Sequence, residues 1–237
     1  LFYLELGLGH VLDINAYDHI LFLTALALPF TFKSWKNVVL LATVFTITHC
    51  LSLALSTYDV LTVDVGLIEF LIPVTIAFTA VFNLLFTNMP TGRKNIGLHA
   101  LATAFFGLIH GFGFSNYFKM LMAEQDNKVV PLLGFAAGIE VSQVLIVLTV
   151  LLLAYLLLNI LKVEQKWFIR VGSILIILIT IPMLIDRKEK LEKIFKFWLF
   201  LIIIIIIDIF FEKFNGSNLL GFKSQDATRI ISFFYDE

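Results

Sequence analysis

Apolar runs of about 20 residues recur along this chain, and an α-helix of that length crosses the ~30 Å hydrocarbon core of a bilayer. The chain is 59% hydrophobic and 15% charged, with a mean hydropathy of +0.95, whereas soluble domains carry about a quarter charged residues. The runs do not alternate apolar and polar residues, as the strands of a membrane barrel would. The predicted fold is therefore an all-α, polytopic membrane helix bundle.

We expect about six transmembrane helices, separated by short polar segments. Their approximate ranges are residues 16–32, 37–56, 65–86, 95–117, 130–158 and 167–185. Residues 1–15 are too short and too polar to span, and we interpret them as an interfacial or re-entrant piece. We assign residues 1–186 to a six-helix transmembrane domain. Residues 187–237 differ in composition and form an atypical C-terminal tail with one hydrophobic segment.

Lysine and arginine in the short loops predict the orientation of the bundle. Basic residues lie in the loops after the first, third and fifth expected spans, whereas the loop after the second has only acidic ones. Cytoplasmic loops carry the excess of Lys and Arg. We therefore expect a multi-pass protein of the bacterial inner membrane with its N-terminus outside.

Histidine and carboxylate side chains interrupt the apolar runs. They are Asp18, His19, His49, Glu69, His110 and Glu140. A charge near the bilayer centre costs at least about 2.5–3.5 kcal/mol on insertion scales, so such residues usually face the bundle interior and mark an ion or proton path. Imidazole and carboxylate are suitable ligands for a borderline divalent metal. Counting the helical rise from each helix entry places these residues in the outer half of the bilayer, and His99 apart from them near the inner face.

Each of these residues also has a purely structural explanation. Asp18 can cap a helix, His49 can bond a neighbouring hydroxyl, and Glu69 can reach the lipid headgroups from a helix entry. His110 stands among glycines that favour close helix approach, but a packing motif would not need the histidine. Glu140 is the deepest carboxylate and the hardest to explain as a surface group.

Composition also argues against several classes of function. A net charge of −1 without a basic stripe argues against a nucleic-acid partner. The single cysteine, Cys50, excludes an internal disulfide and a site with several thiolates. Membrane metalloenzymes use clustered histidine boxes or His-Glu-x-x-His, whereas the five histidines here are dispersed. We expect the lipid bilayer as a partner and no enzymatic activity.

Five motifs occur in a fixed order between residues 7 and 185: LGHVLDINAYDHILFL, FTITHCLSLAL, GLIEFLIPVTIAFTAVFNL, FGLIHGFGFS and GIEVSQ. They resemble the HupE/UreJ family of bacterial membrane proteins, in its second branch. Its members are regarded as nickel or cobalt permeases associated with hydrogenase and urease maturation. The family's N-terminal signature is a His followed by Gly-x-Asp-His. His10 matches the first position and Asp18 and His19 the last two, although the interval is longer here and Ala16 stands where Gly is usual.

The resemblance implies a permease for Ni²⁺ or Co²⁺ with no tightly bound cofactor. The implied metal ligands are Asp18, His19, His49, His110 and Glu140, together with His10, and with Glu69 as a ligand or proton acceptor. Hydrogenase or urease maturation proteins are the implied protein partners, and self-association into a homo-oligomer is left open. Two alternatives stay open at this point: a membrane metalloenzyme, and a proton-linked carrier or accessory protein that binds no metal.

Overall fold

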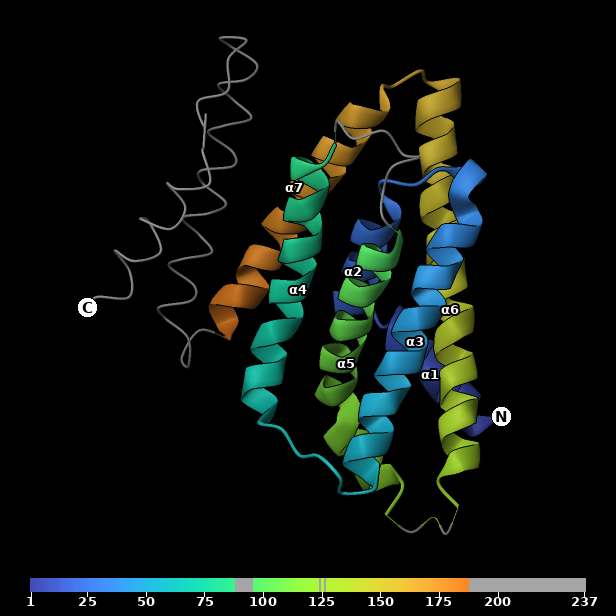
Figure 1. Cartoon of the computed structure of the whole chain (residues 1–237), viewed down its shortest axis with the longest axis vertical. Coiled ribbons are helices and arrows are strands. Elements are labelled where there is room, and N and C mark those ends of the chain that lie inside the picture. Colours follow the sequence, from blue (N-terminus) through green and yellow to red (C-terminus); the bar gives the residue numbers. More distant parts are fainter. Residues whose placement is uncertain (88–95, 124, 126, 188–237) are drawn as a thin grey trace, which may run out of the picture. The chain divides into compact units, whose positions relative to one another are not determined.

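The computed structural model describes residues 1–87, 96–123, 125 and 127–187 (Figure 1). Every regular element in these ranges is a helix: α1 (Phe2–Leu12), α2 (Asp18–Ala27), η1 (Phe32–Ser34), α3 (Trp35–Thr57), α4 (Val65–Leu85), α5 (Ile96–Leu121), α6 (Val129–Tyr155), η3 (Leu156–Ile160) and α7 (Gln165–Asp186). Among them, the stretches long and apolar enough to cross a membrane are Phe32–Thr57, Val65–Leu85, Val129–Ile160 and Gln165–Asp186. The prediction of an all-α, polytopic membrane bundle is confirmed. Apart from Arg187, the predicted C-terminal tail lies outside the described residues.

The first predicted span, residues 16–32, is wrong as a single membrane-crossing helix. α2 has 10 residues, which is about 15 Å of helix and about half of the hydrocarbon core. Pro29 ends it because the proline nitrogen carries no hydrogen to continue the helical bonds. The carbonyl of Ala25, which a residue at position 29 would otherwise bond, accepts instead from the side chain of Asn83 on α4 at 2.7 Å. α2 therefore runs toward the end of the bundle where α4 terminates.

α1 precedes this short helix and crosses the first half of α6 (Figure 1). At the crossing, Gly7 of α1 faces Gly138 of α6. A Cβ atom placed on Gly7 would overlap the backbone carbonyl of Phe135, so the two helices approach at backbone distance, as small residues permit. α1 and α2 together take the place of the expected first span, and residues 13–16 of the turn between them are exposed.

α3 and α5 pack against each other along their length, again through glycines. Gly107 lies against the backbone of Phe45, and Gly111 lies against the backbone carbonyl of His49. His110 directly precedes Gly111 in the chain. The same close approach therefore holds the histidines of α3 and α5 in one layer of the bundle. α4 packs on α5 and on α7 (Figure 1).

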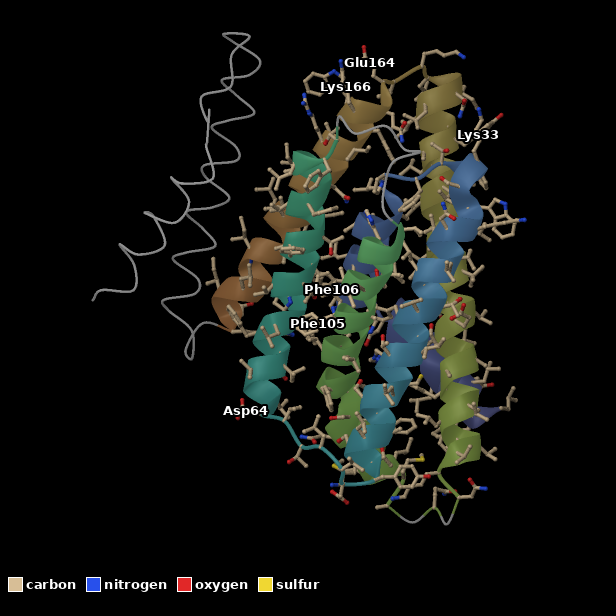
Figure 2. The ribbon with its side chains drawn as sticks, viewed as in Figure 1. Lys33, Asp64, Phe105, Phe106, Glu164 and Lys166 are labelled. Atoms are coloured by element: carbon tan, nitrogen blue, oxygen red, sulfur yellow. The ribbon has the colours of Figure 1, made fainter. Side chains whose placement is uncertain are left out.

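The loops that follow α2 and α6 share one end of the bundle. Lys33, Glu164 and Lys166 lie at this end, whereas Asp64 lies at the opposite one (Figure 2). Lys166 pairs with Glu164 at 2.7 Å. From α3 to α7, successive helices run in opposite directions between the two ends of the bundle, as expected for successive membrane spans (Figure 1).

Candidate metal site

Four imidazole rings from four helices meet in the interior of the bundle. We call them the four-histidine site: His10 of α1, His19 of α2, His49 of α3 and His110 of α5. The ring centroid of His19 lies 4.6 Å from that of His10, 5.6 Å from that of His49 and 5.3 Å from that of His110. His19, His49 and His110 are almost completely buried. His49 stands about 12 Å from the Thr57 end of α3 and about 21 Å from its other end.

Three of these rings already have the spacing of a loose metal site. One ligand nitrogen from each of His10, His19 and His49 lies within 4.8 Å of the other two. Two nitrogens on one ion can stand at most about 4.2 Å apart, twice the ~2.0–2.1 Å bond of imidazole to zinc. A small inward movement of the rings would therefore bring their nitrogens to bonding distance of one ion.

The ring nitrogens that face the site have nothing to bond. Within the described part of the chain, the buried nitrogens without a hydrogen-bond partner include His10 Nε2, His19 Nε2, His110 Nδ1 and both nitrogens of His49. Buried polar atoms are satisfied in about 90% or more of cases, so each exception calls for an explanation such as an ion. A metal ion bound there would explain four of these five atoms together, one from each ring, because an imidazole binds an ion through one of its nitrogens.

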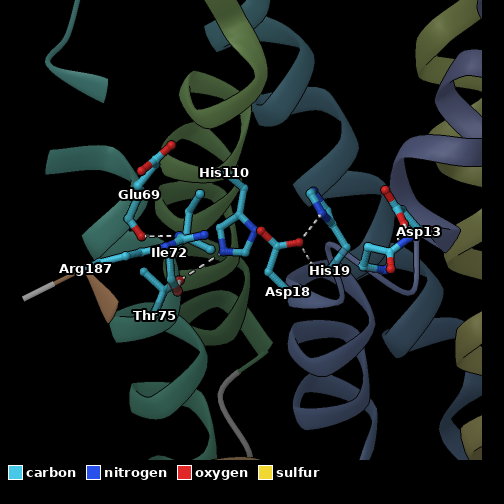
Figure 3. A network of polar contacts seen from close by, with 9 residues as sticks. Asp13, Asp18, His19, Glu69, Ile72, Thr75, His110 and Arg187 are labelled. Carbon is cyan, nitrogen blue, oxygen red and sulfur yellow. Dashed lines mark hydrogen bonds and ion pairs between the residues drawn. The ribbon is translucent and has the colours of Figure 1, made fainter. Parts of the chain in front are cut away.

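Asp18 holds the ring of His19 so that the lone pair of His19 Nε2 is directed into the site. The Asp18 carboxylate accepts from the His19 ring nitrogen Nδ1 at 3.1 Å and from the His19 backbone N–H at 2.9 Å. With the proton assigned to Nδ1 by this bond, Nε2 keeps its lone pair for a metal. A carboxylate behind a ligand histidine sets the tautomer and raises ligand basicity in metal sites. Asp18 itself is 15% exposed and lies between His19 and His110 (Figure 3).

Thr75 of α4 fixes the tautomer of His110, as Asp18 fixes that of His19. The Thr75 hydroxyl donates to the backbone carbonyl of Ile72 at 2.7 Å and lies 3.0 Å from His110 Nε2 (Figure 3). Because a hydroxyl has one hydrogen, the Thr75 oxygen accepts from Nε2–H. Nδ1 of His110 then carries the lone pair. Thr75 was not among the sequence candidates, since a lone threonine on an apolar helix gives no signal of its own.

Replacing Thr75 with valine is expected to weaken metal binding about 10-fold, at the low end of the effect of losing an outer-shell partner. The valine keeps the shape of the side chain but no longer holds the His110 tautomer. Isothermal titration of the purified protein with Ni²⁺ measures the change. Thr79→Val is the matched control, because the hydroxyl of Thr79 donates to the backbone carbonyl of Thr75 one turn away and, among the described residues, not to a histidine. Equal affinities of the two variants would contradict the role of Thr75.

Aromatic side chains enclose the four-histidine site. The ring centroid of Phe114 lies 4.1 Å from that of His10, and the ring centroid of Phe45 lies 5.2 Å from that of His110. Phe22 and Phe135 also contact the histidine rings. Such walls keep bulk water out and strengthen the attraction between a cation and its ligands.

The other predicted ligands lie elsewhere. The carboxylate of Glu140 is hydrogen-bonded to Thr43 and Thr46 and is not in the histidine group. The side chain of Glu69 is exposed, and its backbone carbonyl, which Pro73 cannot bond, accepts from Arg187 (Figure 3).

His99 stands apart from the other histidines, as the sequence predicts. Its ring contacts those of Phe30 and Phe82 and lines an apolar cavity of about 180 Å³ between α2, α4 and α5.

A protein-family model described as HupE / UreJ protein matches residues 1–187. The chain belongs to the HupE/UreJ family. The matched HupE/UreJ segment includes all four helices that carry the histidine site and ends where the described residues end. This is a family of membrane permeases associated with nickel and cobalt transport, not a family of enzymes. No curated protein and no solved structure matches the chain significantly.

Proposed function

We propose that this chain is a membrane permease for a divalent transition metal, Ni²⁺ or Co²⁺, which it binds transiently at the four-histidine site. The observation that carries the proposal is the convergence of four imidazole rings whose inward nitrogens have no protein partner. Imidazole suits divalent metals such as nickel and zinc. Asp18, hydrogen-bonded to His19, adds a carboxylate that would offset part of the charge of the ion.

The broken first span supports transport rather than a fixed structural metal. Discontinuous helices form the ion sites of many secondary transporters, because unwound backbone and half-helix ends meet at the site. Here the turn between α1 and α2 separates His10 from His19. Both halves of the broken span thus contribute a ligand, so a change in the angle between α1 and α2 would open or close the site.

The charges at the two ends of the bundle support the proposed orientation. Lys33 and Lys166 share one end, and Asp64 lies at the other (Figure 2). By the excess of basic residues in cytoplasmic loops, the lysine end faces the cytoplasm of a bacterial inner membrane and the N-terminus lies outside. The four-histidine site then lies nearer the outer face, and hydrogenase or urease maturation proteins would receive the ion inside the cell.

Metal binding and transport by the purified protein test this function. Isothermal titration in detergent is expected to show about one Ni²⁺ per chain, with binding that weakens at acid pH because imidazole must be neutral to bind a metal. Liposomes containing the protein and a metal-sensitive dye are expected to fill faster than empty liposomes. Binding without transport, with metal that resists chelation, would favour a metalloenzyme. Absence of binding would contradict the proposal altogether.

A further inference from the structure

A second polar cluster lies between α3 and α6, apart from the four-histidine site. We call it the Glu140 cluster: Thr43, Thr46, Glu140 and Gln143. One carboxylate oxygen of Glu140, Oε1, lies 2.5 Å from the hydroxyl of Thr43, and the other, Oε2, lies 2.6 Å from the hydroxyl of Thr46. Thr46 also lies 3.2 Å from the amide oxygen of Gln143. Gln143 is fully buried, and its Nε2 has no hydrogen-bond partner in the described residues.

No described cation balances the charge of Glu140. The ionisable side chains on the elements packed against α6 are Tyr3, Glu5, His10, Asp18, His19, Lys33, Lys36, His49 and Cys50. Among the described hydrogen bonds and ion pairs none of them joins the carboxylate, whose partners are Thr43 and Thr46. A lone ionised carboxylate within a membrane-spanning helix is costly.

The two threonines can serve Glu140 in both of its protonation states. Thr43 Oγ1 also lies 3.1 Å from the carbonyl of Val39, and Thr46 Oγ1 lies 3.2 Å from the carbonyl of Ala42. A hydroxyl has one hydrogen and can turn it to either acceptor. When Glu140 is ionised, both hydroxyls donate to it. When Glu140 is protonated, its O–H donates to one hydroxyl, which turns its own hydrogen to the backbone.

The distances within this cluster are those of hydrogen bonds, which can hold a proton. Oxygens 2.5 and 2.6 Å apart have hydrogen-bond spacing. An ion bound between a hydroxyl and a carboxylate would hold the oxygens farther apart, since each metal–oxygen bond is itself about 2.0 Å or longer. The unpartnered Nε2 of Gln143, one turn from Glu140 on the same helix, is a donor, which suits a carboxylate and would repel a cation.

The Glu140 cluster is next to the four-histidine site along α3. Thr46 and His49 are three residues apart, on one face of the helix and about 4.5 Å apart along its axis. A divalent ion at His49 would therefore favour the ionised form of a carboxylate bonded to Thr46.

We propose that Glu140 is the proton-coupling residue of the permease: metal binding at the four-histidine site expels the proton of the Glu140 carboxyl. The O–H bond of the carboxyl breaks, its electron pair stays on the carboxylate, and the proton leaves to water. Thr43 and Thr46 then both turn their hydrogens to Glu140. This inference rests on the proposed function, and it makes transport an exchange of metal for protons.

Counting the protons released on metal binding tests the inference. Titrations with Ni²⁺ in buffers of different ionisation enthalpy give this number for the wild type and for Glu140→Gln. The variant is expected to bind Ni²⁺ at the wild-type stoichiometry and to release about one proton fewer. Glu164→Gln is the control, because Glu164 is an exposed carboxylate at the end of the bundle, and it is expected to release as many protons as the wild type.

A double variant, Thr43→Val with Thr46→Val, checks the same coupling without changing Glu140. Loss of both donors keeps the carboxyl protonated, so this variant is also expected to release about one proton fewer. Wild-type proton release by Glu140→Gln would overturn the inference. So would an affinity loss of more than about 100-fold in a folded Glu140→Gln protein, beyond the range of outer-shell effects, because Glu140 would then be a ligand. Failure of the proposed function is distinguishable, since the wild type itself would then bind no Ni²⁺.

Discussion

Replacing His49 with leucine is expected to weaken Ni²⁺ binding by at least about 100-fold, the upper end of what the loss of a mere outer-shell partner costs. His49 is completely buried, and neither of its ring nitrogens has a hydrogen-bond partner among the described residues. The ring therefore contributes no bond to the fold that leucine would remove. Isothermal titration with Ni²⁺ and uptake of radioactive nickel by expressing cells measure the loss.

The same variant separates a ligand from a structural histidine. Burial of an unsatisfied polar group costs about 1–3 kcal/mol, so His49→Leu is expected to raise the melting temperature of the metal-free protein. The stabilisation that Ni²⁺ gives the wild type should be lost. His99→Leu is the control, because His99 lies in an apolar cavity away from the site, and its Ni²⁺ affinity should stay unchanged. A His49 variant that binds Ni²⁺ normally would remove His49 from the site.

Replacing Gly7 with alanine is expected to lower stability by at least about 1–3 kcal/mol, as overpacking does. The added Cβ would overlap the carbonyl oxygen of Phe135 and stand 3.1 Å from the Cα of Gly138. Both are backbone atoms of α6, which cannot turn aside as a side chain can. α1 would have to move away from α6, and His10 near its end would leave the four-histidine site. The Ni²⁺ affinity is therefore expected to fall together with the stability.

Gly9 provides a matched control on the same helix. A Cβ placed on Gly9 meets nothing within 4 Å, so Gly9→Ala is expected to be neutral or to stabilise by about 0.5–1 kcal/mol through helix propensity. Thermal melts of both variants in detergent, with and without Ni²⁺, measure the difference. Equal melting temperatures would show that α1 is not packed against α6 as described.

The long helices could be predicted from the sequence because hydropathy is a property of composition over a window. α3, α4, α6 and α7 lie close to their expected ranges. Hydropathy does not measure the length of a helix, and residues 16–32 were therefore wrongly predicted to form one span. Pro29 and the turn before Asp18 limit the helix to α2. The run is nevertheless apolar because it packs inside the bundle. The tertiary bond from Asn83 that stabilises this break could not be foreseen.

The sequence predicted how deep the site residues lie in the bilayer, but not the direction in which each side chain points. Counting residues gives the height of a side chain in the bilayer, and it brings His49, His110 and Glu140 to similar heights. Which way each points around its helix depends on packing, and Glu140 faces the threonines of α3 instead of the histidines. His10 was predicted as a ligand because it lies within ten residues of Asp18 and His19 and matches the first position of the family signature. Thr75 could be found only once α4 was seen beside α5.

X-ray absorption at the nickel edge of the Ni²⁺-loaded protein tests the central claim most directly. The four-histidine site predicts three or four imidazole nitrogens around the ion, at about 2.0–2.1 Å if nickel bonds resemble those of zinc, and one fewer in His49→Leu. Cys50 is next to His49 in sequence but does not belong to the histidine group, so no sulfur ligand is expected. A sulfur ligand, or a shell of oxygens without imidazole, would contradict the account.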